Sequence, residues 1–162
     1  MSKINPFLWF DTQAEEAAKL YTSLIPNSKI TEVRYLDADS AKMTGKAEGS
    51  VFTLSFELDG VKYGAMNAGP MFKFNESVSF VINCNSQEEV DKYWNALTAD
   101  GGQESQCGWL KDKFGLSWQI TPKRLFELIG KGGDVTKRVL HAMYQMKKID
   151  IQKLEDAAAG KE

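Results

Sequence analysis

The feature that most constrains this chain is a pattern that occurs twice. The stretch FLWFDTQAEEAAKLYTSL, residues 7–24, aligns without a gap to FVINCNSQEEVDKYWNAL, residues 80–97, at a spacing of 73 residues. In both copies an apolar run with aromatic or β-branched residues comes first, and a polar helix-start signal follows. Such a repeat predicts that two halves of the chain fold into equivalent modules.

Each copy predicts a buried strand followed by an amphipathic helix. Thr12 with Glu15, and Ser86 with Glu89, have the spacing of a hydroxyl cap and a carboxylate that satisfy the first N–H groups of a helix. Apolar residues then recur at positions i, i+3, i+4 and i+7, which share one helix face. They are Ala17, Leu20, Tyr21 and Leu24 in the first copy, and Val90, Tyr93, Trp94 and Leu97 in the second.

Antiparallel strands are expected after each helix. In the first half these are KITEVRYLD, SVFTLSFELDG and VKYGAMNAG, with Asp59-Gly60 as a tight hairpin turn. The polar stretch ADSAKMTGKAEGS between the first two of these strands is predicted to be a loop. In the second half QCGWLKDKF and LSWQITP form a hairpin, with a short or missing strand near GGQESQ.

The predicted fold is therefore of the α+β class, with two tandem βαβββ modules that form a cupped mixed or antiparallel sheet. The modules span 4–70 and 76–122, and a helical tail covers 123–160 of what we treat as a single domain, 1–162. In the tail, KRLFELIG forms one helix. Asp134 is expected to cap VTKRVLHAMYQMKK, and Asp150 to cap IQKLEDAAAG.

Composition excludes several classes of partner. The formal net charge of −2 creates no general attraction for nucleic acid or anionic membranes. No apolar run approaches the roughly 20 residues of a membrane span, and the N-terminus lacks a signal-peptide pattern. With two cysteines, Cys84 and Cys107, a reduced cytoplasmic protein is the simplest expectation.

The duplicated βαβββ unit resembles the vicinal oxygen chelate superfamily, which includes glyoxalase I, bleomycin-resistance proteins and extradiol dioxygenases. Within it the chain is similar to the PhnB-like group, named "3-demethylubiquinone-9 3-methyltransferase" domains. The matching stretches include PFLWFDTQAEEAAKLYTSLIPNSKI, FELDGVKYGAMNAGPMFKFNESVSF, QEEVDKYW, QCGWLKDKFGLSWQITP and HAMYQMKKIDIQKLE, nearly the whole chain. The resemblance implies a cupped sheet and a homodimer, without implying a particular reaction.

The metalloenzymes of that superfamily carry His, Glu or Gln ligands on first and last module strands. Here His141 lies in the tail, and the place of the last-strand glutamate is taken by Gln119. The corresponding strand of the first half offers Gly64, Met66 and Asn67. One amide and no imidazole do not make a tight divalent site, so we expect no bound metal.

The methyltransferase name also finds no support in the residues. A glycine-rich turn after a first parallel strand, typical of S-adenosylmethionine enzymes, is missing, and GKGG at 130–133 follows a predicted helix. Cys107 is a candidate nucleophile if Lys111 shares its strand face, but a cysteine packed beside Trp109 is the simpler interpretation. Cys84 is expected in the core. We therefore predict no cofactor and leave catalytic residues unassigned.

What remains is an aromatic, amide-bearing pocket in the sheet cavity. Such a lining suits a small hydrophobic or planar organic molecule. The candidate ligand-binding residues are Trp9, Asn67, Phe74, Cys107, Trp109, Trp118 and Gln119. Two alternatives stay open: a metal-dependent lyase, isomerase or dioxygenase of the same superfamily, and a non-catalytic structural or interaction dimer.

Overall fold

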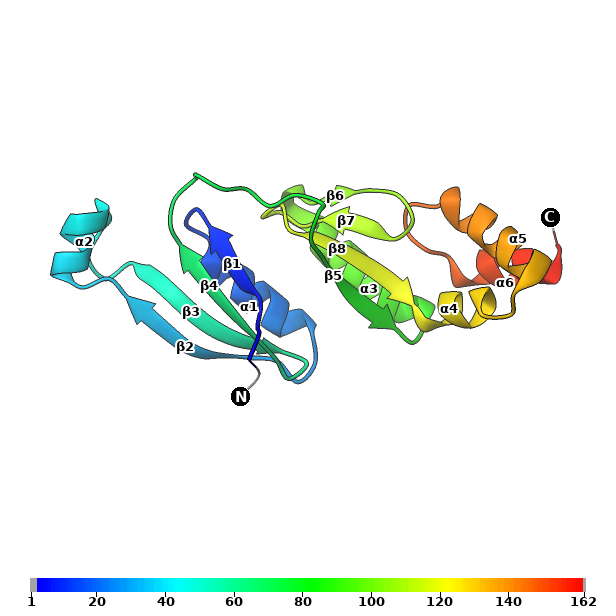
Figure 1. Ribbon diagram of the computed structural model, residues 1–162, viewed down its shortest axis with the longest axis horizontal. Coiled ribbons are helices and arrows are strands. Elements are labelled where there is room, and N and C mark those ends of the chain that lie inside the picture. The colour runs from blue at the N-terminus through cyan, green and yellow to red at the C-terminus, as the bar shows by residue number, and fades with distance from the viewer. Residues whose placement is uncertain (1–2, 162) are drawn as a thin grey trace. The chain divides into compact units, whose positions relative to one another are not determined.

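A computed structural model describes residues 3–161, which divide into two compact units. One unit runs up to Lys73 and the other begins at Phe74 (Figure 1).

The first unit contains a four-stranded mixed sheet and two helices. Along the chain they are β1 (Phe7–Phe10), α1 (Ala14–Leu24), β2 (Lys29–Tyr35), α2 (Ala38–Thr44), β3 (Val51–Leu58) and β4 (Val61–Asn67). The strand order is β1-β4-β3-β2, with β1 parallel to β4 and the other neighbours antiparallel. Asp59 and Gly60 both have positive φ in the predicted hairpin turn between β3 and β4.

The second unit repeats this topology. Its first elements are β5 (Ser79–Cys84), α3 (Gln87–Thr98), a 3₁₀ turn (Ala99–Gly101), β6 (Gln103–Glu104), β7 (Trp109–Lys111) and β8 (Ser117–Pro122). The strand order is β5-β8-β7-β6, with β5 parallel to β8. The predicted duplication of a βαβββ module is confirmed, as two four-stranded sheets with the same order and the same directions.

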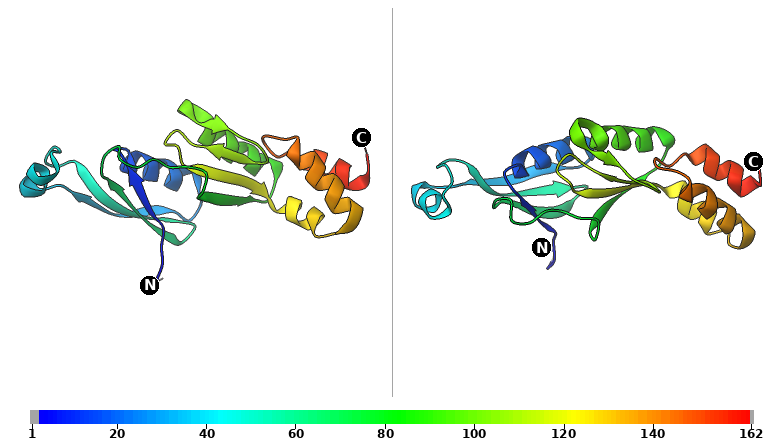
Figure 2. Two further views of the ribbon diagram at one scale, coloured as in Figure 1. Left: turned by 45° about the horizontal axis from the view of Figure 1, so that its top comes forward. Right: turned by 90° about the horizontal axis from the view of Figure 1, so that it is seen from above.

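In each unit the helix of the repeat covers one face of its sheet (Figure 2). The predicted stripe of α3 is fully buried, with Val90, Trp94 and Leu97 exposing 2% or less. In α1 the buried face is made of Tyr21 and small alanines, so the sheet lies close to the helix backbone. Burial of each large apolar side chain contributes about 1.5–3 kcal/mol, which holds both helices on their sheets.

The gapless alignment of the repeat is wrong for the strands by one residue. Leu8 and Phe10 are buried on the α1 side of β1, while Phe7 is 58% exposed on the other side. In β5, however, Phe80 points to the α3 side, where its ring meets Trp118 at 5.5 Å. Because strand side chains alternate between faces, Phe7 and Phe80 cannot be structural equivalents. The helices of the two copies align at a spacing of 73 residues. The strands align only when this spacing is changed by one residue.

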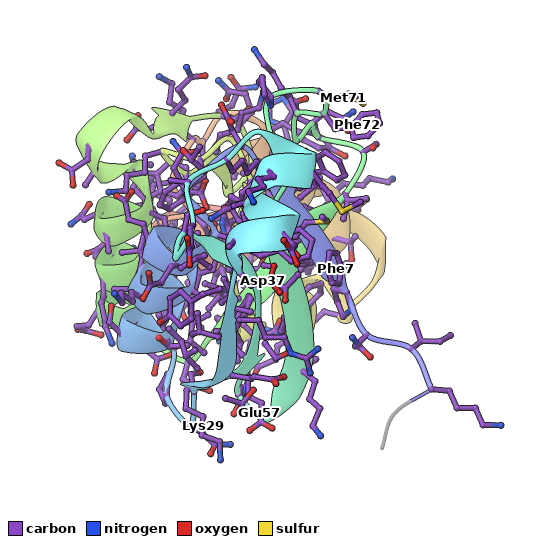
Figure 3. All side chains as sticks on the ribbon, turned by 90° about the vertical axis from the view of Figure 1, so that its left-hand side faces the viewer. Phe7, Lys29, Asp37, Glu57, Met71 and Phe72 are labelled. Carbon is purple, nitrogen blue, oxygen red and sulfur yellow. The ribbon has the colours of Figure 1, made fainter. Side chains whose placement is uncertain are left out.

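One predicted loop is a helix. The segment ADSAKMTGKAEGS contains α2, which begins after Asp37, and Figure 3 shows Asp37 at its start. The Asp37 carboxylate accepts a hydrogen bond from the Ser40 N–H at 2.7 Å, and Gly45 ends the helix in the left-handed conformation. The same figure shows Lys29 beside Glu57, an ion pair of 3.8 Å between β2 and β3.

The other helix-start predictions have mixed outcomes. Ser86 caps α3 as expected by accepting from the Glu89 N–H, and Asp150 caps α6 by accepting from the Lys153 N–H. Thr12 does not cap α1, whose N-cap position is Gln13 without a side-chain bond. Asp134 lies in the first turn of α5 rather than at its cap, because Gly132 takes the cap position.

The tail forms three helices with a core of their own: α4 (Lys123–Ile129), α5 (Gly133–Tyr144) and α6 (Ile151–Ala159). That core contains Leu125, Leu128, Val139, Met146, Ile149 and Leu154. The tail joins the rest of the second unit through backbone bonds from Cys107 N to Met146 O and from Gly108 N to Lys147 O. The Gln87 side chain adds bonds to Ile149 O and Ile151 N.

Among residues 3–161, none of the helices is long and apolar enough to cross a lipid bilayer.

Candidate functional site

The second sheet has one face covered by α3, and no helix among residues 3–161 covers the other face. The strand register places Phe80, Trp118, Leu110 and Glu104 side by side on one face. This is the α3 face, because Glu104 accepts a hydrogen bond from the indole of Trp94 on α3. The alternate residues form what we call the helix-free face of the second unit. These residues are Ser79, Val81, Gln103, Trp109, Lys111, Ser117 and Gln119.

Trp109 and Gln119 are direct cross-strand neighbours on this helix-free face. Both side chains are partly exposed. The Gln119 amide nitrogen donates to Ser79 Oγ at 2.9 Å, which fixes the orientation of the amide and leaves its carbonyl oxygen as an acceptor. A flat indole beside an oriented amide can hold a planar molecule and hydrogen-bond to its edge.

A cavity of about 130 Å³ opens beside Trp109. Its lining residues are Glu76, Gln103, Glu104, Ser105, Trp109, Leu110, Lys111 and Ser117. Ser117 is 1% exposed, and its hydroxyl has no hydrogen-bond partner among the residues that the structure describes. An unsatisfied buried hydroxyl is costly, by about 1–3 kcal/mol, so this group is free to accept or donate to a ligand.

Lys111 supplies the positive charge of the cavity. It lies directly opposite Ser117 in the sheet register and forms an ion pair with Glu76, in the segment before β5. The hydrogen bond from Lys111 holds the pKa of the Glu76 carboxyl below its ordinary value. Glu76 is positioned by a turn in which the Asn75 side chain accepts from the Ser77 N–H at 2.9 Å.

The helix-free face of the first unit is aromatic. The Trp9 indole donates to Gly69 O at 2.9 Å, and its ring meets Phe72 edge-on at 5.0 Å. Phe7 lies over Gly64, where an added Cβ would come within 2.5 Å of the Phe7 ring. Phe7 and Phe72 are labelled in Figure 3 and are more than half exposed. This face offers apolar contact area, with the polar atom of its tryptophan already used.

Of the seven residues predicted to bind a ligand, the structure brings Trp109 and Gln119 together. Trp9 lies in the first unit. Phe74 is half-buried in the segment before β5. Cys107 is outside β7 in a left-handed turn with φ of 57°, so the alternation that would align it with Lys111 does not reach it.

The other two predicted residues, Asn67 and Trp118, lie on the helix-covered faces. The side-chain carbonyl of Asn67 accepts a hydrogen bond from the Ala14 N–H at 2.9 Å, and its side-chain amide nitrogen donates to the backbone carbonyl of Val51 at 3.1 Å. Asn67 therefore takes over the capping of α1. Trp118 is 2% exposed, and its indole donates to the Asp112 carboxylate at 2.9 Å. A change at Trp118 would report on folding rather than on a ligand.

Ser117 and Glu76 were missed by the sequence reasoning, and Lys111 was considered only as a neighbour of Cys107. Period-two alternation through LSWQITP puts Ser117 on the face of Gln119, so a signal for that residue existed. Nothing in the sequence shows that Ser117 is buried, or that Glu76 reaches Lys111.

The described residues include no group of three or more His, Cys, Asp and Glu side chains that could hold a metal ion. His141 is exposed on α5. Cys84 is completely buried, and burial raises the pKa of its thiol to about 12, with a further contribution from Glu89. Cys84 is therefore a protonated core thiol near neutral pH.

A larger cavity of about 510 Å³ lies at the starts of α3, α4 and α6, but its charges are already matched. Lys123 donates to the Asn85 side chain, and Arg124 pairs with Glu127 and Glu155. A third cavity, of about 360 Å³ in the first unit, is lined by Lys46, whose ammonium group donates to Asn67 O. Among the described residues that line these two cavities, no buried polar side chain lacks a hydrogen-bond partner.

The chain is similar to a known protein family and to several solved structures. The family model described as 3-demethylubiquinone-9 3-methyltransferase matches residues 2–121. A solved structure from Bacillus cereus, described as a putative 3-demethylubiquinone-9 3-methyltransferase, PhnB protein, is 32% identical with a TM-score of 0.67. That match covers 75% of this chain and 99% of the Bacillus cereus chain. Search of the curated proteins gives no match.

Two more distant structures share the fold. Protein PA1353 from Pseudomonas aeruginosa is 18% identical with a TM-score of 0.59, covering 75% of this chain and 98% of its own. The fosfomycin resistance protein FosX from Listeria monocytogenes is 16% identical with a TM-score of 0.53, covering 78% and 94%. The family match ends before the tail, so the expected resemblance of HAMYQMKKIDIQKLE lies outside the matched range.

Proposed function

We propose that this chain, which belongs to the 3-demethylubiquinone-9 3-methyltransferase (PhnB-like) family of the vicinal oxygen chelate superfamily, binds a small planar organic molecule. The proposed site is the helix-free face of the second unit. The observation that carries the proposal is the pairing of Trp109 with Gln119, whose amide is oriented by Ser79.

The central pair of the site, Trp109 and Gln119, favours binding of a flat molecule. Trp109 offers an aromatic face, and Gln119 is a neutral amide that orients a ligand without exchanging protons. The family resemblance also implies that this amide takes the place of the superfamily's last-strand metal ligand.

The test follows the indole N–H signals of the four tryptophans by NMR during titration with benzamide, a flat neutral probe. We expect a saturable shift at Trp109 and none at Trp9. Gln119→Ala should weaken this binding about fivefold, because a net hydrogen bond contributes about 1 kcal/mol. Asn95→Ala, an exposed amide on α3, is the control. A response centred on Trp9, or one unaffected by Gln119→Ala, would place the site elsewhere.

We also propose that the protein acts as a homodimer and without a tightly bound metal, as the family resemblance and the donor set favour. Sedimentation should give twice the 18.1 kDa mass of the chain. Elemental analysis after purification without chelator should find no stoichiometric transition metal. A monomer at micromolar concentration, or one metal per chain, would favour the alternatives stated from the sequence.

A further inference from the structure

The cavity beside Trp109 holds a carboxylate that belongs to the chain itself. Glu76 reaches across from the segment before β5 to the Lys111 ammonium group, and its side chain remains 61% exposed. Exposed ion pairs of this kind contribute little to stability. Glu76 can therefore be displaced at small cost to the fold.

Next to this ion pair lies the one polar group of the cavity lining that is buried and has no partner among the described residues. Ser117 and Lys111 are opposite each other in the β7–β8 register, and both line the cavity. Directly opposed residues in an antiparallel pair have Cβ atoms about 4.5–5.5 Å apart. A single carboxylate can thus accept a hydrogen bond from each residue, one oxygen from Lys111 and the other from Ser117.

The position of Trp109 determines what the carboxylate should be attached to. Trp109 lies two residues before Lys111 on the same face of β7, which is about 7 Å along the strand. A ligand with its acid group at Lys111 and Ser117 would lay a flat carbon skeleton of about one ring against the indole. The cavity volume of about 130 Å³ accommodates the acid end of such a molecule.

We infer that the ligand is a small planar carboxylic acid, and that Glu76 occupies the position of its carboxylate until the ligand displaces it. This inference rests on the proposed function, because it names the class of molecule that the Trp109 site takes. Glu104, the other acid of the lining, is already bonded to the Trp94 indole at 2.8 Å and lies 3.8 Å from Lys147. It therefore does not compete for Lys111.

The experiment compares benzoate with benzamide, which differ in charge and little in shape, on the full-length chain. Dissociation constants come from the Trp109 indole signal. Removing the internal competitor in Glu76→Gln should tighten benzoate binding at least threefold. Lys111→Gln should weaken benzoate about tenfold, because it removes a charge-assisted hydrogen bond. Benzamide affinity should stay unchanged in both variants.

Ser117→Ala provides a readout that a structural role would not give. It should weaken benzoate several-fold while the melting temperature of the free protein stays equal or rises, because an unsatisfied buried hydroxyl is removed. The matched controls are Asp134→Asn and Lys137→Gln, an exposed ion pair on α5 whose loss should change neither probe.

The outcomes separate this inference from the proposed function. If benzamide binds at Trp109 but benzoate affinity is the same in wild type, Glu76→Gln and Lys111→Gln, the carboxylate inference is overturned and the proposed function stands. If neither probe shifts Trp109 in any variant, both are overturned. A fall in melting temperature of Ser117→Ala would show that the hydroxyl has a partner in the free protein and would also contradict the inference.

Discussion

At the scale of single residues, several side chains that look alike in the sequence have opposite roles. Asn67 and Gln119 are both amides on strands that lie next to a parallel neighbour. One is buried under α1 with both ends bonded, and the other is oriented on a helix-free face. Their positions relative to the covering helix decide which of them a ligand can reach.

Asn67→Ala should lower the free energy of unfolding by about 2–3 kcal/mol, because the Ala14 N–H and the Val51 carbonyl lose their partner. Chemical denaturation measures this, with Asn95→Ala as a control expected within about 0.5 kcal/mol. A stable Asn67→Ala variant with altered probe binding would instead return Asn67 to the candidate site.

Two glycines with nearly the same φ test the join between the sheet and the tail. Gly108 (φ +83°) would place a Cβ 2.9 Å from Ile120 O, whereas Gly115 (φ +86°) has nothing within 4 Å. Gly115→Ala should cost about 1 kcal/mol for its left-handed backbone. Gly108→Ala should cost about 2–4 kcal/mol, since crowding adds to the same strain. Equal losses in thermal or chemical unfolding would contradict this account.

At the scale of elements, α2 depends on its caps more than on packing. It has seven residues, and helices this short are marginal without packing or caps. Ala41 is its buried residue, while Met43 is 88% exposed. The Asp37 cap is therefore a large part of what holds α2.

Asp37→Ala should increase hydrogen exchange in α2 while leaving β3 and β4 protected. The backbone hydrogen bond from Ser40 lowers the pKa of Asp37, so the cap stabilises the native state above the ordinary pKa near 3.8. This contribution is lost as the pH falls through the lower native pKa. In the wild type, the α2 amides should therefore lose protection against exchange below pH 4. In Asp37→Ala this pH dependence should be absent. Asp39→Ala, in the first turn, is the control.

The helices and strands were largely predictable from the sequence, and so was the buried face of α3, but the buried faces of the strands were not. Apolar residues such as Val90, Trp94 and Leu97 recur at helical spacing, so the sequence alone identifies the buried side of α3. Alternation along a strand divides its residues into two sets but does not say which set the helix covers. Trp118 and Trp109 were therefore both candidates for the site, and tertiary packing separates them. α2 was missed because the stretch between its N-cap Asp37 and Gly45 has no stripe of apolar residues at helical spacing.

At the scale of the whole molecule, the tail is an addition to the family domain. The family match ends at residue 121, and the Bacillus cereus relative is matched over 99% of its own length. The tail has its own core and is hydrogen-bonded to the rest of the second unit at Cys107, Gly108 and Gln87. It can therefore stabilise the second unit without being needed to form its sheet.

A chain that ends at Pro122 should retain its sheets and unfold cooperatively at a lower temperature than the full chain. Circular dichroism and calorimetry measure both properties. Gln87→Ala in the full chain should shift the melting temperature in the same direction by a smaller amount, because it removes only the side-chain bonds to Ile149 and Ile151. A truncated chain without sheet signal would show that the tail is part of the second module's fold.

The one-residue difference in phase between β1 and β5 has a consequence for how tandem copies come to differ. A single added or deleted residue ahead of a helix turns over every side chain of the preceding strand at once, which no small number of substitutions achieves. Phe7 and Phe80 are identical residues in the aligned repeat, yet Phe7 is exposed to solvent and Phe80 packs against Trp118. Length variation in short connections is thus a route by which one half of a doubled protein acquires a surface that its twin does not have.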